Sequence, residues 1–202
     1  MLASVAHEHS TPRATLHDDQ HGYSLIELLF VCALLAVIGA ASIPQSLAMI
    51  ERARAFAAAR YLSARMAQAR LTAVSRSATV SLRFDRDARG FTFRAFVDGN
   101  RNGVRTRDIL AGIDREIDEP VRLGDLFPGV TIGLQPDLGG GDGLQVGGDL
   151  LSFSSSGTAT SGSVYIRGPD ASQFVVRVLG ATGRTRVLRY DPGRAEWVDA
   201  LW

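Results

Sequence analysis

Residues 25–43 read LIELLFVCALLAVIGAASI, an apolar run in which Glu27 is the only charged residue. A helix of this length spans roughly 28 Å, which is close to the ~30 Å hydrocarbon core of a bilayer. No amphipathic period interrupts the run, which disfavours a buried core helix and predicts a membrane-spanning one. A cleavable secretory signal is the next alternative, but the preceding leader is acidic and residues 40–42 make only a mediocre cleavage site.

Three residues stand in a fixed arrangement around this run. Gly22 and Glu27 lie in HGYSLIEL, residues 21–28, and Pro44 directly follows the run. An acid just inside an apolar segment is costly when it is ionised and unpaired, so Glu27 calls for a functional explanation. The arrangement resembles the class III signal of type IV pilins and type II secretion pseudopilins. The resemblance implies that a prepilin peptidase cuts between Gly22 and Tyr23 and methylates the new amine of Tyr23.

The same resemblance implies that Glu27 and Pro44 act in assembly. In a filament, the carboxylate of Glu27 would pair with the Tyr23 amine of a neighbouring subunit, which compensates two buried charges and favours one axial register. Pro44 lacks a backbone N–H donor, so we expect the helix to kink or melt locally there. Tyr23 stands where the family more often has phenylalanine.

The leader, residues 1–22, departs from the family because it is long and acidic rather than short and basic. Counting arginines alone would place residues 45–77 in the cytoplasm. The cleavage motif implies the opposite, because its peptidase acts on the cytoplasmic side. We therefore expect a single-pass inner-membrane protein whose C-terminal domain is periplasmic, and the true start of the chain stays open.

Composition excludes several classes of protein. The formal net charge is only +1, which argues against a protein that coats nucleic acid, and all 22 basic residues are arginine. The single cysteine, Cys32, excludes a disulfide framework. All four histidines precede Gly22, so the processed chain lacks the commonest general base and a frequent metal ligand. We expect no enzyme activity, no cofactor and no small-molecule substrate.

The remainder of the chain has two patterns. Apolar residues recur at helical spacing through residues 45–77, which contain no glycine or proline. Short alternating runs follow, and 78–84 with 91–97 read as a hairpin. We expect further strands at 130–134, 150–153, 164–167, 174–179 and 185–190. A long helix followed by an antiparallel sheet is an α+β fold.

The predicted organisation has three parts. Residues 1–22 are the leader peptide, residues 23–77 the N-terminal helix with its transmembrane segment 25–43, and residues 78–202 a periplasmic β-rich globular domain. The tail from residue 191 onward has no counterpart in the pilins that the chain resembles.

Three short motifs suggest a subgroup. They are FVDGNRNG at 96–103, LLSFSSSGTATSGSVYIR at 150–167 and GRTR at 183–186. Their order and spacing resemble the FimT/GspH group of minor pilins and pseudopilins. The resemblance implies a pilin-like fold and a structural subunit that joins other pilins or pseudopilins in a type II secretion pseudopilus or a type IV pilus. A membrane-anchored protein that never polymerises is a further alternative.

The first candidate ligand site is a calcium loop. Asp98, Asn100 and Asn102 match the first ligand positions of an EF-hand. Ile109 stands where that loop has its bidentate glutamate, and nearby arginines would repel a cation. The sequence therefore favours a polar turn between two strands and leaves calcium as a weak alternative.

The second candidate site is formed by Arg184, Arg186 and Arg189, which lie on or beside a predicted strand. In some FimT-like minor pilins a late G-R-x-R motif is associated with double-stranded DNA binding during natural transformation, and arginine suits phosphate. Asp191 and Glu196 lie close in sequence and favour a structural or subunit-facing edge. A DNA-binding minor pilin is thus the alternative function.

Overall fold

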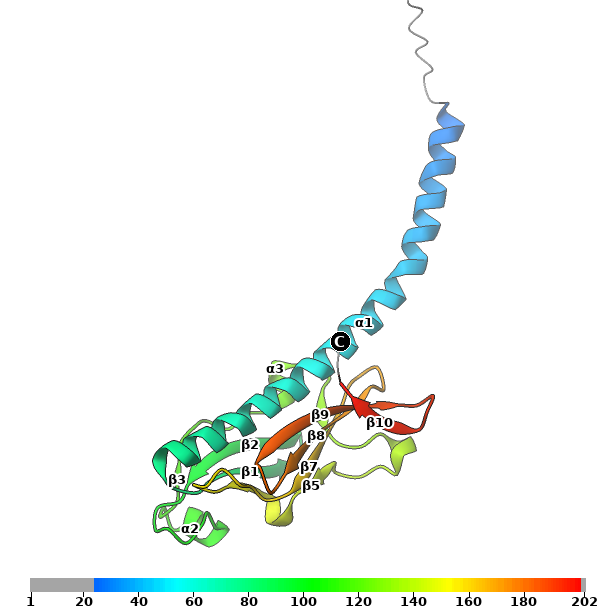
Figure 1. Ribbon diagram of the computed structural model, residues 1–202. Helices are drawn as coiled ribbons and strands as arrows, with labels where there is room; N and C mark the ends of the chain where they lie inside the picture. Colours follow the sequence, from blue (N-terminus) through cyan, green and yellow to red (C-terminus); the bar gives the residue numbers. More distant parts are fainter. Residues whose placement is uncertain (1–23, 201–202) are drawn as a thin grey trace, which may run out of the picture. The chain divides into compact units, whose positions relative to one another are not determined.

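The computed structural model describes residues 24–200, except for the side chains of residues 41–48 (Figure 1). The chain divides into two compact units, residues 1–43 and residues 44–202. The predicted leader and the cleavage site between Gly22 and Tyr23 lie outside the described residues. The α+β prediction is confirmed: a long helix, α1 (Leu25–Arg76), precedes antiparallel sheets.

The first unit contributes the beginning of α1. The described side chains of residues 25–40 are all exposed, among them Leu25 at 76%, Phe30 at 70% and Val37 at 68%. Helical assignment continues through Pro44, so the expected kink stays a prediction. Within the described residues, no helix of the structure is both long enough and apolar enough to cross a bilayer.

The second unit packs the later part of α1 on β-sheets. One face of the helix is buried at helical spacing and consists mainly of small residues: Ala55, Ala58, Ala59, Leu62, Met66, Ala69 and Ala73. Alanine is the strongest helix former and its short side chain lets a sheet approach closely. The helix therefore forms one wall of the main hydrophobic core.

The strands form two antiparallel sheets. The first has the order β3-β2-β1-β6, and the second has the order β10-β9-β8-β7-β4 with β5 also paired to β7. Their bounds are β1 Val80–Asp87, β2 Gly90–Val97, β3 Arg115–Glu116, β4 Thr131–Ile132, β5 Leu144–Gln145, β6 Leu150–Phe153, β7 Gly162–Arg167, β8 Gln173–Leu179, β9 Arg184–Asp191 and β10 Glu196–Asp199. Side chains from both sheets join α1 in one core, including the fully buried Phe84, Phe93, Phe153 and Phe174.

The predicted hairpin is confirmed, with Phe84 opposite Phe93. Its strands run further than expected, to Asp87 and from Gly90, because Gly90 takes a φ of +109° and closes a tighter turn. The strand expected at 130–134 was too long: only Thr131–Ile132 pairs with β7. The short elements β3, β5, β10, α2 (Thr106–Leu110) and α3 (Leu123–Leu126) were not predicted.

Candidate functional site

The three candidate arginines lie on β9 but do not share a face. Arg184 and Arg186 are two positions apart and point to the face away from α1, whereas Arg189 has the opposite parity. Arg186 stands opposite Arg177 in the register of β8 and β9. The structure thus brings Arg177, which the sequence did not suggest, beside Arg184 and Arg186, and separates Arg189 from them.

The charges of this outer face are only partly neutralised. One guanidinium nitrogen of Arg186 donates to both carboxylate oxygens of Asp199 on β10, at 2.9 and 2.8 Å. Among the described residues, no acid pairs with Arg177 or Arg184. These two arginines border a groove of about 830 Å3 that Ser161 and Thr182 also line. A polyanion could contact two free arginines here, rather than three.

The glycine of GRTR has a packing role. Gly183 has a φ of +61°, and a Cβ there would lie 2.4 Å from the carbonyl oxygen of Gly157 and 2.9 Å from Cδ of Arg70. Arg70, on α1, donates from Nε to that same carbonyl at 2.8 Å. We call these three residues, Arg70, Gly157 and Gly183, the glycine clasp. It joins two of the three motifs that suggested the subgroup.

The third residue of GRTR faces α1 as well. The hydroxyls of Thr185 and Ser63 form a hydrogen bond of 2.7 Å. Gly183 and Thr185 therefore hold β9 on the helix, while Arg184 and Arg186 point away. The motif has a packing half and an exposed half, and the packing half alone accounts for two of its four residues.

The loop of the calcium candidate is filled by its own backbone. Asp98 accepts hydrogen bonds from the backbone N–H groups of Asn100, Arg101 and Gly103, the last at 2.7 Å. The side chain of Asn102 donates to Asp108 at 3.0 Å, and this bond lowers the pKa of Asp108 below its ordinary value of 3.8. These contacts support a polar turn. Within the described part of the chain, no group of three acids, histidines or cysteines could hold a metal.

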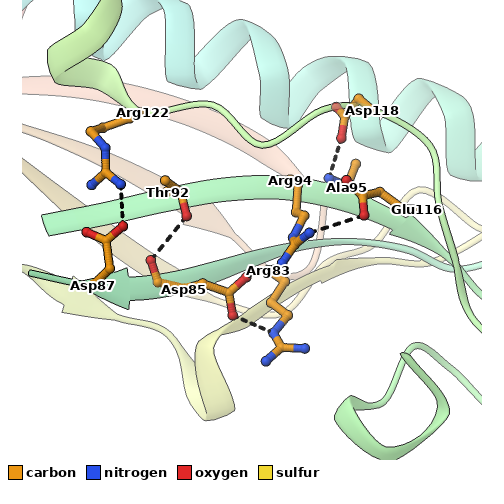
Figure 2. A network of polar contacts seen from close by, with 9 residues as sticks. All are labelled: Arg83, Asp85, Asp87, Thr92, Arg94, Ala95, Glu116, Asp118 and Arg122. Atoms are coloured by element: carbon orange, nitrogen blue, oxygen red, sulfur yellow. Dashed lines mark hydrogen bonds and ion pairs between the residues drawn. The ribbon is translucent and has the colours of Figure 1, made fainter. Parts of the chain in front are cut away.

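Sequence reasoning missed a polar network on the first sheet (Figure 2). Asp85 binds Arg83 at 2.9 Å and Arg94 at 3.3 Å, and Arg94 continues to Glu116 at 3.2 Å. The alternation of apolar and charged residues in LRFD, residues 82–85, was the available signal. These partly exposed pairs cover the face of the hairpin that points away from the core.

The same network fastens two loop segments to the sheet. The side chain of Arg122 donates to Asp87, and this bond, with a second from the backbone N–H of Arg89, lowers the pKa of Asp87. Asp118 accepts from the backbone N–H of Ala95 and pairs with Arg65 of α1. Both carboxylates, of Asp87 and Asp118, are thus paired with arginines and accept hydrogen bonds, which is typical of a structural network.

Of the predicted assembly residues, only Glu27 has a described side chain. It lies in the first turn of α1 and is exposed. A negative charge at this end of a helix is favourable, because the N-terminus carries partial positive charge.

Two family models match the chain. The model for type II transport protein GspH matches residues 58–183, from the buried face of α1 to the glycine clasp. The model for the prokaryotic N-terminal methylation motif matches residues 18–43, which include Gly22, Tyr23 and Glu27. No curated protein and no solved structure matches the chain. The GspH match covers more than half of the chain and follows a methylation motif, so the chain belongs to the GspH family of pseudopilins, within the type IV pilin-like superfamily.

Proposed function

We propose that this chain is a minor pseudopilin anchored in the inner membrane by residues 25–43, with residues 78–202 in the periplasm. Prepilin peptidase cuts between Gly22 and Tyr23 and methylates Tyr23. The processed chain then assembles through α1 with other pilins or pseudopilins, in a type II secretion pseudopilus or a type IV pilus. The observation that carries the proposal is a methylation motif joined to a GspH-type body on one chain.

The role of the protein in this proposal is structural rather than enzymatic. The exposed apolar side chains of residues 25–40 pack against lipid before assembly and against neighbouring helices in the filament. Glu27 pairs with the Tyr23 amine of the adjacent subunit and sets the axial register, since an unpaired carboxylate in an apolar environment is unfavourable. Pro44 separates this packing segment from the part of α1 that belongs to the second unit.

The decisive experiment compares Glu27→Ala with Glu51→Ala, an acid further along the same helix. Each variant is expressed with its partner pilins, and mass spectrometry measures cleavage after Gly22 and methylation of Tyr23. Sheared filaments are then probed for the protein. We expect Glu27→Ala to be cleaved yet to lose on the order of tenfold or more of its filament incorporation, which corresponds to the loss of one buried ion pair. Equal incorporation of both variants would contradict the register role.

The alternative function, DNA binding in natural transformation, is supported by Arg177 and Arg184, which lack acidic partners among the described residues. Labelled double-stranded DNA would be titrated with the processed full chain in detergent at several salt concentrations. If DNA binds, the Arg177→Ala/Arg184→Ala pair should abolish salt-sensitive binding, because phosphate contacts release counterions. Arg189→Ala, on the other face of β9, is the matched control. Absence of binding at low salt would eliminate this alternative.

A further inference from the structure

Two adjoining cavities lie within the second unit, beside the part of α1 that follows Pro44. The first, of about 360 Å3, is mainly apolar and is lined by Met49, Arg52, Ala53, Phe56, Phe174, Arg189 and Ala200. The second, of about 430 Å3, has a more polar lining, which includes Asp170, Ser172, Gln135 and Tyr190. Arg52 and Arg189 line both cavities and so mark the boundary between an apolar and a polar compartment.

The polar compartment contains two buried oxygen atoms without hydrogen bonds. The side chain of Asp170 is only 5% exposed. Its Oδ1 accepts from the backbone N–H of Ser172 at 3.2 Å, but its Oδ2 accepts no hydrogen bond and has Arg52 Nε at 3.6 Å. Ser172 Oγ is likewise buried without a partner. Since buried polar atoms in folded proteins are almost always hydrogen-bonded, these two atoms indicate a site for a donor.

A tight turn between β7 and β8 holds these atoms in place. Ala171 takes a φ of +61°, which is unfavourable for a residue with a side chain. A Cβ at Gly168 would lie 2.4 Å from Ser172 Oγ and 2.9 Å from Cβ of Ala55 on α1. The turn is therefore pressed against the helix, and strain is retained at the position that presents Asp170.

The charges around the boundary are complementary to a zwitterion. Arg189 has no acidic partner among the described residues, and Arg52 makes only the long contact with Asp170. Two guanidinium groups can therefore receive an anion between the compartments. On the polar side, Asp170 and Asp137 offer carboxylates to a cation that also donates hydrogen bonds. On the apolar side, Phe56 packs in a tilted arrangement against the buried Phe174, with ring centroids 5.7 Å apart, and both rings line the first cavity.

We propose that this double cavity binds one zwitterionic phospholipid that carries a primary ammonium group. The phosphate lies between Arg52 and Arg189, the ammonium donates to Asp170 and Ser172, and part of an acyl chain covers Phe56 and Phe174. The proposal rests on the membrane anchorage proposed above, because Met49 and Arg52 follow closely after segment 25–43 in the sequence. A lipid bound here would fix the second unit at the bilayer surface before the subunit enters a filament.

Native mass spectrometry of the processed full chain in detergent micelles tests the proposal. The probes are phosphatidylethanolamine, phosphatidylcholine, whose quaternary ammonium has no N–H donor, and phosphatidylglycerol, which has no cation. We expect retention of one phosphatidylethanolamine in preference to the other two. Arg189→Gln and Asp170→Asn should each weaken that retention about tenfold, as expected for one charged hydrogen bond. Arg184→Gln, on the opposite face of β9, is the matched control and should leave it unchanged.

Equal retention of the three lipids would overturn the proposal, and so would a loss of phosphatidylethanolamine retention in Arg184→Gln equal to that in Arg189→Gln. Lipid binding that appears only after deletion of residues 201–202 would also overturn it, because that segment of the chain would then be the occupant of the apolar compartment. If Asp170→Asn does not fold, Arg189→Gln alone tests the lipid site, because Arg189 is exposed and its replacement should leave the fold intact. Carbonate extraction of membranes measures anchorage separately. A chain that is anchored but does not select the lipid contradicts only this inference, whereas one that carbonate extracts contradicts the proposed anchorage.

Discussion

Residues 25–40 and residues 55–73 belong to the same helix, α1, yet only the second stretch has a buried face. In the first stretch the large side chains Leu25, Phe30 and Val37 are exposed, whereas in the second Leu62 and Met66 are completely buried. Helix propensity does not distinguish the two stretches, so tertiary packing does. The first stretch is apolar and exposed, whereas the second contributes to the main hydrophobic core.

The largest expected effect comes from replacing one leucine in each stretch, Leu62 in the buried one and Leu34 in the exposed one. Leu62→Ala should lower the free energy of unfolding by about 2–5 kcal/mol, because it leaves a cavity between α1 and the sheets. Leu34→Ala should change it by less than about 0.5 kcal/mol, the range of exposed substitutions. Chemical denaturation of the processed chain in detergent, followed by circular dichroism, measures both. Similar losses would mean that residues 25–40 also pack within the chain.

The next largest effect is expected at the glycine clasp, which lies near the end of the buried stretch and holds α1 against the sheet. Gly183→Ala should cost about 1–3 kcal/mol of unfolding free energy, from its positive φ and from overlap with the carbonyl of Gly157. Gly147→Ala is the control, since a Cβ there meets nothing within 4 Å. Thermal and urea unfolding of both variants provide the test, and indistinguishable stabilities would exclude the clasp as a packing constraint.

A smaller loss is expected from the arginine of the clasp. Arg70→Met removes the hydrogen bond to Gly157 and should lower the unfolding free energy by about 0.5–1.5 kcal/mol. Arg54→Met, an exposed position on the same helix, should be nearly neutral. A double-mutant cycle with Gly183→Ala should show non-additive losses, because the two residues are in contact. Strict additivity would mean that Arg70 and Gly183 stabilise the chain independently of one another.

The smallest expected effect is on the stability of the fold at low pH. Asp108 and Asp87 have lowered pKa values in the folded chain, owing to hydrogen bonds from Asn102 and Arg122 respectively. A lowered folded pKa stabilises the protein above the unfolded value of 3.8, and this contribution is lost as the pH falls through the folded value. Asp108→Asn should therefore show a shallower loss of stability than the unaltered chain between neutral pH and pH values below 3.8. Urea unfolding over this range measures it, and parallel pH profiles would contradict the assignment.

Much of the fold could be predicted from local pattern. The helix and the hairpin are encoded by hydrophobic period alone, and alternation around Phe84 and Phe93 even determines which side chains face the core. β10 was missed because its four residues, Glu196–Asp199, carry an acid at each end and show no alternation of apolar and polar residues. The turn sequence DPG at 191–193, followed by EWVD, was the signal that could have revealed it.

The site was less predictable. Parity along β9 already separates Arg189 from Arg184 and Arg186, so this part was available from the sequence. The pairing of Arg186 with Asp199 depends on β10, and the proximity of Arg177 depends on the register of β8 and β9. The double cavity needs α1, β8, β9 and the turn at Asp170 together. Contacts of this kind are tertiary, and no local pattern encodes them.

The hydrogen bonds that close the glycine clasp and its neighbour have a consequence for biogenesis. Arg70 and Gly157 are 87 positions apart, and Ser63 and Thr185 are 122 apart. During synthesis α1 therefore leaves the ribosome long before the strands that cover it. The face of α1 that is buried in the folded chain stays exposed until β9 has been synthesised. Contacts between such distant residues also slow folding. For the membrane-anchored pseudopilin proposed above, the first stretch of α1 would be available for insertion before the second unit folds, so the order of synthesis follows from the chain topology.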